Sequence, residues 1–310
     1  MTTFLEGLSR SVRGEAFRDA PLAPRTAIRV GGRADLLVRP ADPDDLALVL
    51  RACREAEVPL RVLGGGTNLL VSDEGVRGVV VKLPPEFGGE LAEGRRLVLS
   101  AGSPSSRLVA RAQKLGLVGC EFVAGIPGTL GGLTAMNAGT RSGEMKDVLV
   151  RVELATALGA GFVPARELGF GYRTAELPEG AVVTRVEVEL EPGDVAASAA
   201  AMKADVERRR ATQPLSQPNF GSTFRNPRGD YAGRLIEAVG LGGHRVGGAA
   251  FSKVHANFIV NEGRASARDV LSLMNLARER VRAAFGVTLE PEVRLWGAFE
   301  AGLLEAAARP

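Results

Sequence analysis

The stretch Phe122–Thr140, FVAGIPGTLGGLTAMNAGT, decides the fold of this 310-residue chain. It has no charged residue and is nearly as long as a membrane-spanning helix. Five glycines, three threonines, Pro127 and Asn137 make it too polar and too interrupted to cross a bilayer. Glycines let the backbone approach a phosphate or a flat ring closely, and backbone N–H groups can bind a pyrophosphate without a charged side chain. We therefore interpret this stretch, the second cassette, as a ligand-binding wall.

The first cassette lies upstream at Leu63–Leu70, LGGGTNLL, and follows a predicted strand. Consecutive glycines turn the backbone tightly and expose successive N–H groups, which can form an anion-binding concavity. Taken alone, three glycines are more typical of a plain turn. Neither cassette has the G-x-G-x-x-G pattern of a Rossmann domain or the G-x-x-x-x-G-K-[ST] pattern of a P-loop NTPase. Two such cassettes would have to hold one extended ligand from two sides.

The composition excludes several classes of protein. The net charge of +3 is spread along the chain, which is not typical of a nucleic-acid-binding protein. Two histidines and two cysteines cannot form a Cys-rich zinc site or a disulfide framework, so we expect no metal site and a reducing compartment. The N-terminal sequence MTTFLEGLSRSVRGEAF lacks the apolar core of a signal peptide. We expect a cytoplasmic protein. Its arginine-rich balance fits GC-rich coding and a warm habitat equally well.

Hydrophobic periodicity predicts an α/β (α+β) chain in which helices and strands alternate. Asp42-Pro43 has the pattern of a helix N-cap followed by a first-turn proline. The predicted helices are Ser105–Leu115, Val195–Arg210, Asp230–Val239 and Ser266–Phe285. The predicted strands are Leu60–Leu63, Gly78–Leu83, Leu97–Ala101, Val148–Ala155, Ala181–Leu190, Asn257–Asn261 and Thr288–Trp296.

Seven blocks in the same order resemble the UDP-N-acetylenolpyruvoylglucosamine reductases, flavoenzymes that complete UDP-N-acetylmuramate in bacterial peptidoglycan synthesis. The resemblance runs from about Thr26 to Gly297. The blocks are TAIRVGGRADLLV (26–38), LGGGTNLLVSDEGVRGVVV (63–81), FVAGIPGTLGGLTAMNAGT (122–140), FGYR (170–173), GSTFRNP (221–227), AGRLIEAVGLGGHRVGGAAFSKVHANFIVN (232–261) and LEPEVRLWG (289–297).

The resemblance implies a two-subdomain FAD-binding fold of the vanillyl-alcohol-oxidase type, followed by a C-terminal α/β substrate-binding domain. We place the two FAD-binding subdomains at residues 1–85 and 86–197, and the substrate-binding domain at 198–310. The last segment could return to the FAD domain. The implied activity is NADPH-dependent reduction of a carbon–carbon double bond, a step of cell-wall biogenesis on which cell shape and division depend.

The same resemblance implies that both cassettes bind FAD, with the segment around Val30–Gly32 near the adenine half. The predicted cofactor-binding residues are Gly64, Gly65, Gly66, Thr67, Asn68, Leu69, Gly125, Ile126, Pro127, Gly128, Thr129, Gly131, Gly132, Asn137 and Gly139. Neither cysteine and neither histidine lies where a covalent flavin link would be expected, so we predict non-covalent FAD, with NADPH as co-substrate.

Three predicted catalytic residues follow from the matched blocks. Ser222 in GSTFRNP matches the family's proton donor, and Arg173 in FGYR would hold the substrate carboxylate with its planar fork. Glu292 in LEPEVR would lie across the intermediate. Taken one at a time, these residues are typical of a turn serine, a surface arginine and a solvent-facing glutamate. Their places in matched blocks favour the catalytic roles.

The predicted substrate-binding residues are Tyr172, Arg225, Asn226, Lys253 and Arg294. Some family members carry an extra C-terminal loop with a tyrosine that closes over the diphosphate. This chain has only Tyr172 and Tyr231 and no such insertion between about Arg225 and Asn261, so it resembles the shorter branch.

Two other functions fit parts of this pattern. A flavin oxidase of the same scaffold would be expected to carry a covalent His or Cys link and a different C-terminal domain. A catalytically silent binding protein would be expected to lack one of Ser222, Arg173 and Glu292, yet all three are present. We expect the reductase, acting as a monomer on a small UDP-sugar, with no nucleic-acid or membrane partner.

Overall fold

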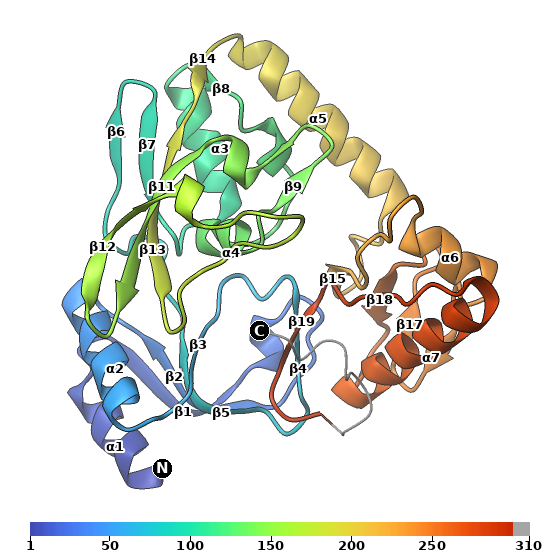
Figure 1. Cartoon of the computed structure of the whole chain (residues 1–310), viewed down its shortest axis with the longest axis horizontal. Coiled ribbons are helices and arrows are strands. Elements are labelled where there is room, and N and C mark those ends of the chain that lie inside the picture. Colours follow the sequence, from blue (N-terminus) through green and yellow to red (C-terminus); the bar gives the residue numbers. More distant parts are fainter. Residues whose placement is uncertain (300–310) are drawn as a thin grey trace. The chain divides into compact units, whose positions relative to one another are not determined.

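The computed structural model describes residues 1–299, which form two compact units (Figure 1). Unit 1 consists of Met1–Asp19, Asp35–Gly65 and Gly78–Arg208. Unit 2 consists of Ala20–Ala34, Gly66–Arg77 and the described residues from Arg209 to Phe299. The chain therefore passes between the units several times. Each of the two units is described separately.

Unit 1 begins with a small helix-covered sheet. Its strands have the order β1-β2-β5-β3, and β3 runs parallel to β5. The elements are α1 (Thr2–Ser11), β1 (Glu15–Pro21), β2 (Arg33–Arg39), α2 (Pro43–Glu55), β3 (Leu60–Val62) and β5 (Val76–Val81). Asp42 caps α2 by accepting a hydrogen bond from the Asp45 N–H at 3.0 Å, as the Asp-Pro signal predicted.

A second, antiparallel sheet with the order β12-β11-β13-β7-β6 completes unit 1. Its strands are β6 (Leu91–Glu93), β7 (Arg96–Ser100), β11 (Leu149–Thr156), β12 (Gly159–Pro164) and β13 (Val182–Glu189). Helix α4 (Leu130–Ala135) packs against β7 and β13, and α3 (Ser105–Lys114) packs against β8 (Leu117–Val118) and η2 (Glu121–Val123). The remaining short elements are β9 (Gly139–Thr140), β10 (Gly143–Glu144), η3 (Met145–Asp147), η4 (Ala165–Glu167) and β14 (Glu191–Pro192).

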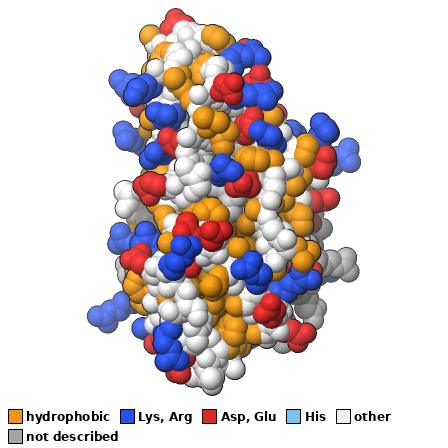
Figure 2. All heavy atoms as spheres, turned by 90° about the vertical axis from the view of Figure 1, so that its left-hand side faces the viewer, with side chains coloured by type: hydrophobic (Ala, Val, Ile, Leu, Met, Phe, Trp, Pro, Cys, Tyr) orange, Lys and Arg blue, Asp and Glu red, His pale blue; other side chains and the backbone are white. Residues whose placement is uncertain are grey.

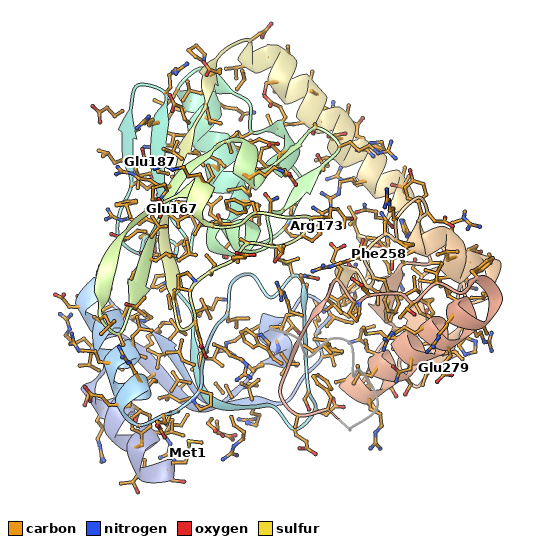
Figure 3. All side chains as sticks on the ribbon, in the orientation of Figure 1. Met1, Glu167, Arg173, Glu187, Phe258 and Glu279 are labelled. Carbon is orange, nitrogen blue, oxygen red and sulfur yellow. The ribbon has the colours of Figure 1, made fainter. Side chains whose placement is uncertain are left out.

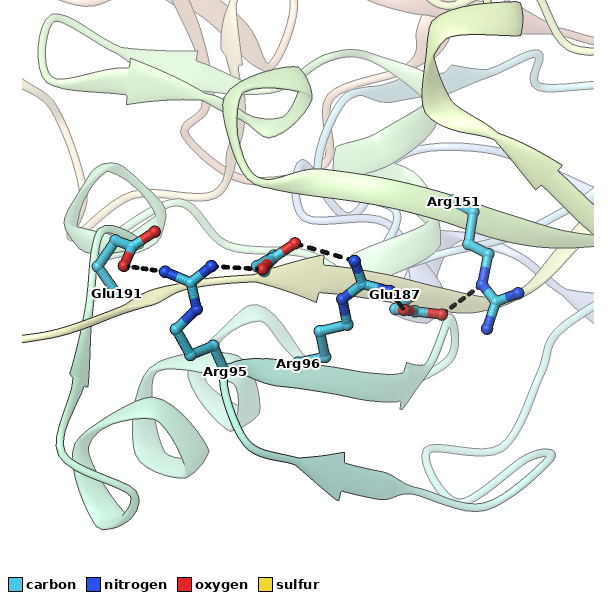
Figure 4. A network of polar contacts seen from close by, with 6 residues as sticks. Arg95, Arg96, Arg151, Glu187 and Glu191 are labelled. Carbon is cyan, nitrogen blue, oxygen red and sulfur yellow. Dashed lines mark hydrogen bonds and ion pairs between the residues drawn. The ribbon is translucent and has the colours of Figure 1, made fainter.

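Charged side chains cover part of this second sheet (Figure 4). The Glu187 carboxylate is almost fully buried and accepts a hydrogen bond from Arg151 Nε at 2.5 Å, with Arg96 Nη1 at 3.5 Å. Arg95 forms ion pairs with Glu189 and Glu191 at 2.8 and 2.5 Å. The buried charge of Glu187 is therefore balanced by cations whose own side chains reach solvent, which reduces the cost of its burial.

Unit 2 contains a four-stranded antiparallel sheet with the order β15-β18-β17-β16. Its strands are β15 (Asn219–Ser222), β16 (Arg245–Val246), β17 (Ala249–Phe251) and β18 (Phe258–Asn261). The long helix α7 (Ala267–Phe285) contacts β16, β17 and the shorter helix α6 (Ala232–Ala238). Unit 2 also contains η1 (Ala23–Arg25), and α5 (Val195–Thr212) crosses the boundary between the units.

A separate parallel pair in unit 2 joins two distant parts of the sequence. Strand β4 (Leu69–Val71), from the first cassette, pairs with β19 (Arg294–Trp296). The predicted strand Thr288–Trp296 is therefore wrong over its first six residues, because only its last three form β19. Pro291 cannot donate to a strand ladder, and this part of the chain instead forms an isolated bridge with Phe224.

Most of the other predicted elements are confirmed to within a few residues, whereas helix α1 was not predicted. The second cassette contains the short elements η2, α4 and β9, separated by turns. Across residues 1–299, no helix is long and apolar enough to cross a membrane. The division at residues 85 and 197 stays a prediction. Figure 2 shows Lys and Arg side chains interspersed with Asp and Glu over one face of the molecule.

Candidate active site

In unit 1, the second cassette is fixed tightly to the end of β7. The Gly131 N–H donates to the Ala101 carbonyl at 2.9 Å, and a Cβ on Gly131 would lie 3.0 Å from the Ala101 Cβ. Thr129 caps α4, since its hydroxyl accepts a hydrogen bond from the Gly132 N–H at 3.4 Å. The glycine at 131 is therefore needed for packing, which places the beginning of α4 directly against the sheet.

The two cassettes meet at one pocket within unit 1. Gly64 from the first cassette and Thr129, Gly131 and Gly132 from the second all line it. A Cβ on Gly64 would lie 2.7 Å from the Thr129 hydroxyl oxygen, so a larger residue would displace the side chain that caps α4. The remaining wall is mainly apolar and consists of Val62, Leu63, Leu83, Ala101, Gly102, Ala135, Leu177, Ala181 and Val183.

This pocket has the chemistry that a flavin dinucleotide needs. An apolar wall suits a flat ring, and glycine backbone can approach a diphosphate closely. Within residues 1–299, the N–H groups of Gly64 and Gly65 donate to no other residue, so both remain available to a phosphate. The residues present therefore fit FAD, and the pocket agrees with the prediction that the two cassettes act on one ligand.

The end of the second cassette contacts the FGYR block. Arg173 Nη1 donates to the Gly139 carbonyl at 3.0 Å, and the guanidinium lies 5.4 Å from the centre of the Tyr172 ring. Arg173 is labelled in Figure 3. Asn137 is fully buried, and its Nδ2 donates to the Gly171 carbonyl at 3.1 Å. A Cβ on Gly139 would lie 2.5 Å from the Glu144 Cβ, so this glycine is needed where β9 meets β10.

The remaining cassette residues of unit 1 form turns. Gly125 and Gly128 have φ values of +74° and +137°, which favour glycine. The Ile126 N–H donates to the Val123 carbonyl at 3.0 Å, and the Ile126 carbonyl accepts from the Ser105 hydroxyl at 2.6 Å. Pro127 lies between these turns and is exposed.

In unit 2, the second half of the first cassette contacts the LEPEVR block. Asn68 Nδ2 donates to the Glu292 carbonyl at 3.0 Å, and the Arg294 N–H donates to the Asn68 carbonyl at 3.1 Å. Leu69 is the strand partner of Arg294, and Thr67 lies in the preceding turn. Gly66 has φ +64°, and a Cβ there would lie 2.1 Å from the Arg25 carbonyl oxygen. A segment predicted to bind cofactor thus also positions Glu292 and Arg294.

Unit 2 also places the GSTFRNP block alongside LEPEVR. The Glu292 N–H donates to the Thr223 carbonyl at 2.9 Å, and the Arg225 N–H donates to the Glu290 carbonyl at 2.9 Å. Ser222 directly precedes this paired segment, at the end of β15. Two of the three predicted catalytic residues are therefore brought together by backbone pairing. The third, Arg173, belongs to unit 1.

Asn257 holds this arrangement and was not identified from the sequence. Its side chain is 3% exposed, its Oδ1 accepts from the Phe224 N–H at 3.0 Å, and its Nδ2 donates to the Phe224 carbonyl at 2.8 Å. The Thr223 N–H donates to the Asn257 carbonyl at 2.7 Å. The Asn257 N–H in turn donates to Nδ1 of His255, whose pKa is lowered by burial. His255 Nδ1 thus acts as an acceptor within this arrangement, while the structural role expected of both histidines stays a prediction.

Two arginines in unit 2 lie close together without an acidic partner. The pKa of Arg294 is lowered, first by burial of its guanidinium and then by the charge of Arg225. Arg225 Nε is buried and has no hydrogen-bond acceptor in the described part of the chain. Neither arginine forms an ion pair with any residue from 1 to 299. Two guanidinium groups without acidic partners among the described residues have the charge and the donors to bind an anion.

The other predicted substrate-binding residues, Lys253, Asn226 and Tyr172, are exposed. The Lys253 stem lies over Gly243, where an added Cβ would approach the Lys253 Cε to 2.9 Å, and its ammonium group has no acidic partner among the described residues. Asn226 Oδ1 accepts from the Ala232 N–H at 3.1 Å, at the beginning of α6. Tyr172 is 53% exposed.

Both cysteine thiols are buried, and burial raises the pKa of Cys53 to about 11 and that of Cys120 to about 12. Both therefore stay protonated and unreactive at neutral pH. In the part of the chain that is described, no group of three His, Cys, Asp or Glu side chains could hold a metal ion.

Comparison with known proteins finds two family matches, one in each part of the chain. Residues 34–161 match the FAD binding domain family, and residues 213–296 match the C-terminal domain of UDP-N-acetylenolpyruvoylglucosamine reductase. These matches confirm the predicted fold class.

Several full-length relatives carry the same name. The chain is 68% identical over 298 residues to UDP-N-acetylenolpyruvoylglucosamine reductase of Anaeromyxobacter sp. (strain Fw109-5), covering 96% of this chain and 94% of the relative. It is 52% identical to the enzyme of Myxococcus xanthus, covering 90% and 91%. The crystal structure of the reductase from Thermus caldophilus has a TM-score of 0.78 at 40% identity, covering 92% of this chain and 99% of that one. The chain therefore belongs to the UDP-N-acetylenolpyruvoylglucosamine reductase family.

Proposed function

We propose that this chain reduces the enolpyruvyl ether of UDP-N-acetylglucosamine-enolpyruvate to UDP-N-acetylmuramate, a precursor of peptidoglycan, using NADPH and non-covalent FAD. Identity of 68% over nearly the whole chain supports the reaction and favours it over a flavin oxidase or a silent binding protein. The match to the FAD binding domain family supports the cofactor. The buried cysteine thiols support its non-covalent attachment.

The two cassettes would hold FAD in unit 1 at the pocket that Gly64, Thr129, Gly131 and Gly132 line, with the N–H group of the neighbouring Gly65 as a further donor. Bound FAD would supply the redox chemistry, taking a hydride from NADPH and returning it to the vinyl carbon of the substrate. The protein's contribution there is an apolar wall that excludes water and N–H donors that fix the diphosphate.

The polar residues would then stabilise the negative charge that forms on the substrate and donate a proton to it. Hydride addition to the vinyl carbon places negative charge on the neighbouring carbon and on its carboxylate. Arg173 would bind that carboxylate through its planar fork, and Ser222 would give its hydroxyl proton to the neighbouring carbon. Glu292 would stabilise the intermediate from its place beside the Ser222 segment.

The nucleotide part of the substrate would bind to the unneutralised cations of unit 2. Arg225 and Arg294 lack acidic partners among residues 1–299, and the same is true of Lys253. Diphosphate oxygens would satisfy both guanidinium groups and relieve their mutual repulsion. Asn226 and Tyr172 would complete the contacts. We assign the chain to the shorter branch of the family, without the extra tyrosine loop, and we expect a cytoplasmic monomer.

The single observation that carries this proposal is the backbone pairing of Thr223 with Glu292 and of Arg225 with Glu290. It joins GSTFRNP to LEPEVR, so that Ser222 and Arg225 lie on one segment and Glu292 and Arg294 on the adjacent one. This proximity supports the proposal that Ser222 donates the proton, that Glu292 stabilises the intermediate and that the two arginines bind the diphosphate. A hydroxyl, a carboxylate and two arginines on adjacent segments suit a substrate that has a diphosphate and a carbon atom that must be protonated.

A visible spectrum recorded without oxygen tests the proposal. The purified protein should be yellow, should lose its absorbance when NADPH is added, and should regain it on addition of the enolpyruvyl UDP-sugar. Mass spectrometry should then find UDP-N-acetylmuramate. A protein that has been loaded with FAD and that shows neither change would contradict the proposed function.

A further inference from the structure

The Tyr172–Arg173 pair lies at the tip of a tight turn in unit 1. The Gly171 N–H donates to the Thr174 carbonyl at 3.0 Å, and the Thr174 N–H donates back to the Gly171 carbonyl at 3.3 Å. Arg173 has φ +59°, a left-handed conformation that such turns usually give to glycine or asparagine. For arginine this conformation is disfavoured, so other contacts must hold it in place.

The C-terminal end of the second cassette supplies those contacts. Asn137 Nδ2 donates to the Gly171 carbonyl at 3.1 Å, and the Gly139 carbonyl accepts from Arg173 Nη1 at 3.0 Å. The segment 137–139 therefore contacts both the first residue of the turn, Gly171, and the guanidinium group of Arg173. The second contact depends on the first, because a shift of Gly171 would move Arg173 with it.

Asn137 is itself anchored firmly. Its N–H donates to the Thr134 carbonyl at 3.0 Å at the end of α4, and its Oδ1 accepts from the Lys146 N–H at 3.0 Å. Its φ of +41° is one that asparagine tolerates better than most residues. The side chain is 0% exposed, so it connects three backbone segments from the interior.

We infer that Asn137 is a positioning residue, which sets Arg173 to receive the substrate carboxylate. This inference rests on the proposed function and modifies it, because Asn137 was expected to contact FAD. Both polar atoms of its buried amide are engaged with the backbone of the chain, so its effect reaches the substrate through the Gly171–Thr174 turn. The α4 segment that lines the flavin pocket is thereby joined to the arginine.

The test uses two ligands that differ in the 3-O-lactyl group, which contains the carboxylate that Arg173 would recognise. UDP-N-acetylmuramate carries a carboxylate, whereas UDP-N-acetylglucosamine lacks it. Titration calorimetry with the FAD-loaded, oxidised enzyme gives the ratio of the two dissociation constants. Asn137→Asp keeps the acceptor for Lys146 but loses the donor to Gly171. Asn137→Gly tolerates the positive φ and removes the whole amide.

We expect both variants to weaken UDP-N-acetylmuramate binding about tenfold, as the loss of one charge-assisted contact would. Binding of UDP-N-acetylglucosamine, flavin content and the rate of bleaching by NADPH should stay within about twofold of wild type. Adding either substitution to Arg173→Ala should cause no further loss, because both act through one guanidinium.

Loss of affinity for both sugars alike, or losses that add to that of Arg173→Ala, would show that Asn137 has only a general structural role. Undiminished carboxylate discrimination in both Asn137 variants would also overturn the inference. Failure of the proposed function has a different signature, since wild type itself would then fail to recover its colour with the enolpyruvyl sugar.

Discussion

Replacing Asn257 by alanine tests how strongly one buried amide supports the catalytic half of unit 2. The substitution removes the partners of the Phe224 N–H and the Phe224 carbonyl, at 3.0 and 2.8 Å. Phe224 is 0% exposed, so water cannot easily replace them. Each buried polar group left without a partner costs about 1–3 kcal/mol. With two such groups, we expect the free energy of unfolding to fall by about 2–6 kcal/mol.

The assay is urea unfolding followed by the fluorescence of Trp296, the one tryptophan of the chain, which lies in β19 of unit 2. Asn275→Ala in α7 is the matched control, because no hydrogen bond of its side chain is found among the described residues. That control should be neutral or slightly stabilising, since alanine favours helix. A change below about 0.5 kcal/mol for Asn257→Ala would refute the reasoning, because surface substitutions give changes of this size.

Three further predictions concern individual groups. The Thr223 hydroxyl is buried without a partner in the described residues, so Thr223→Val should leave the free energy of unfolding in urea unchanged or raise it. A fall of more than about 1 kcal/mol in that free energy would show that the hydroxyl has a stabilising contact. Arg294→Met removes a cation that Arg225 repels, so the ligand-free protein should keep its stability while UDP-sugar affinity, measured by calorimetry, falls about tenfold to a hundredfold. The hydrogen bond from Arg185 holds the pKa of Glu153 below its ordinary 4.5. This pair therefore stabilises the protein above pH 4.5, and the stabilisation is lost as the pH falls through the lowered pKa. Glu153→Gln should make the free energy of unfolding in urea depend less on pH between about pH 6 and pH 3.

Local signals predicted much of the fold. Ser266 and Asp269 form the capping box of α7, and Gly286 ends the helix with φ +69°, so its sequence alone indicated both ends. The Asp42 cap of α2 is a local signal of the same kind. Such features depend on neighbours within a few residues, and sequence patterns record them directly.

Contacts between distant segments could not be predicted in this way. Strand β19 pairs with β4, which lies more than two hundred residues earlier, and the first part of the predicted long strand instead forms an isolated bridge between Pro291 and Phe224. Asn257 has no sequence signal of its own, because its importance comes from pairing with a residue 33 positions away. The resemblance located the candidate residues, whereas no sequence pattern indicated that the first cassette is divided between the two units after Gly65.

The most direct test of the account is the two half-reactions of Ser222→Ala, measured by stopped-flow absorbance without oxygen. We predict bleaching by NADPH within about threefold of wild type, because Ser222 has no role in that step. Recovery of colour with the enolpyruvyl UDP-sugar should slow by about a hundredfold or more, since the proton donor is absent. Recovery at the wild-type rate, or a loss of bleaching instead, would contradict the assignment of Ser222 and the chemistry built on it.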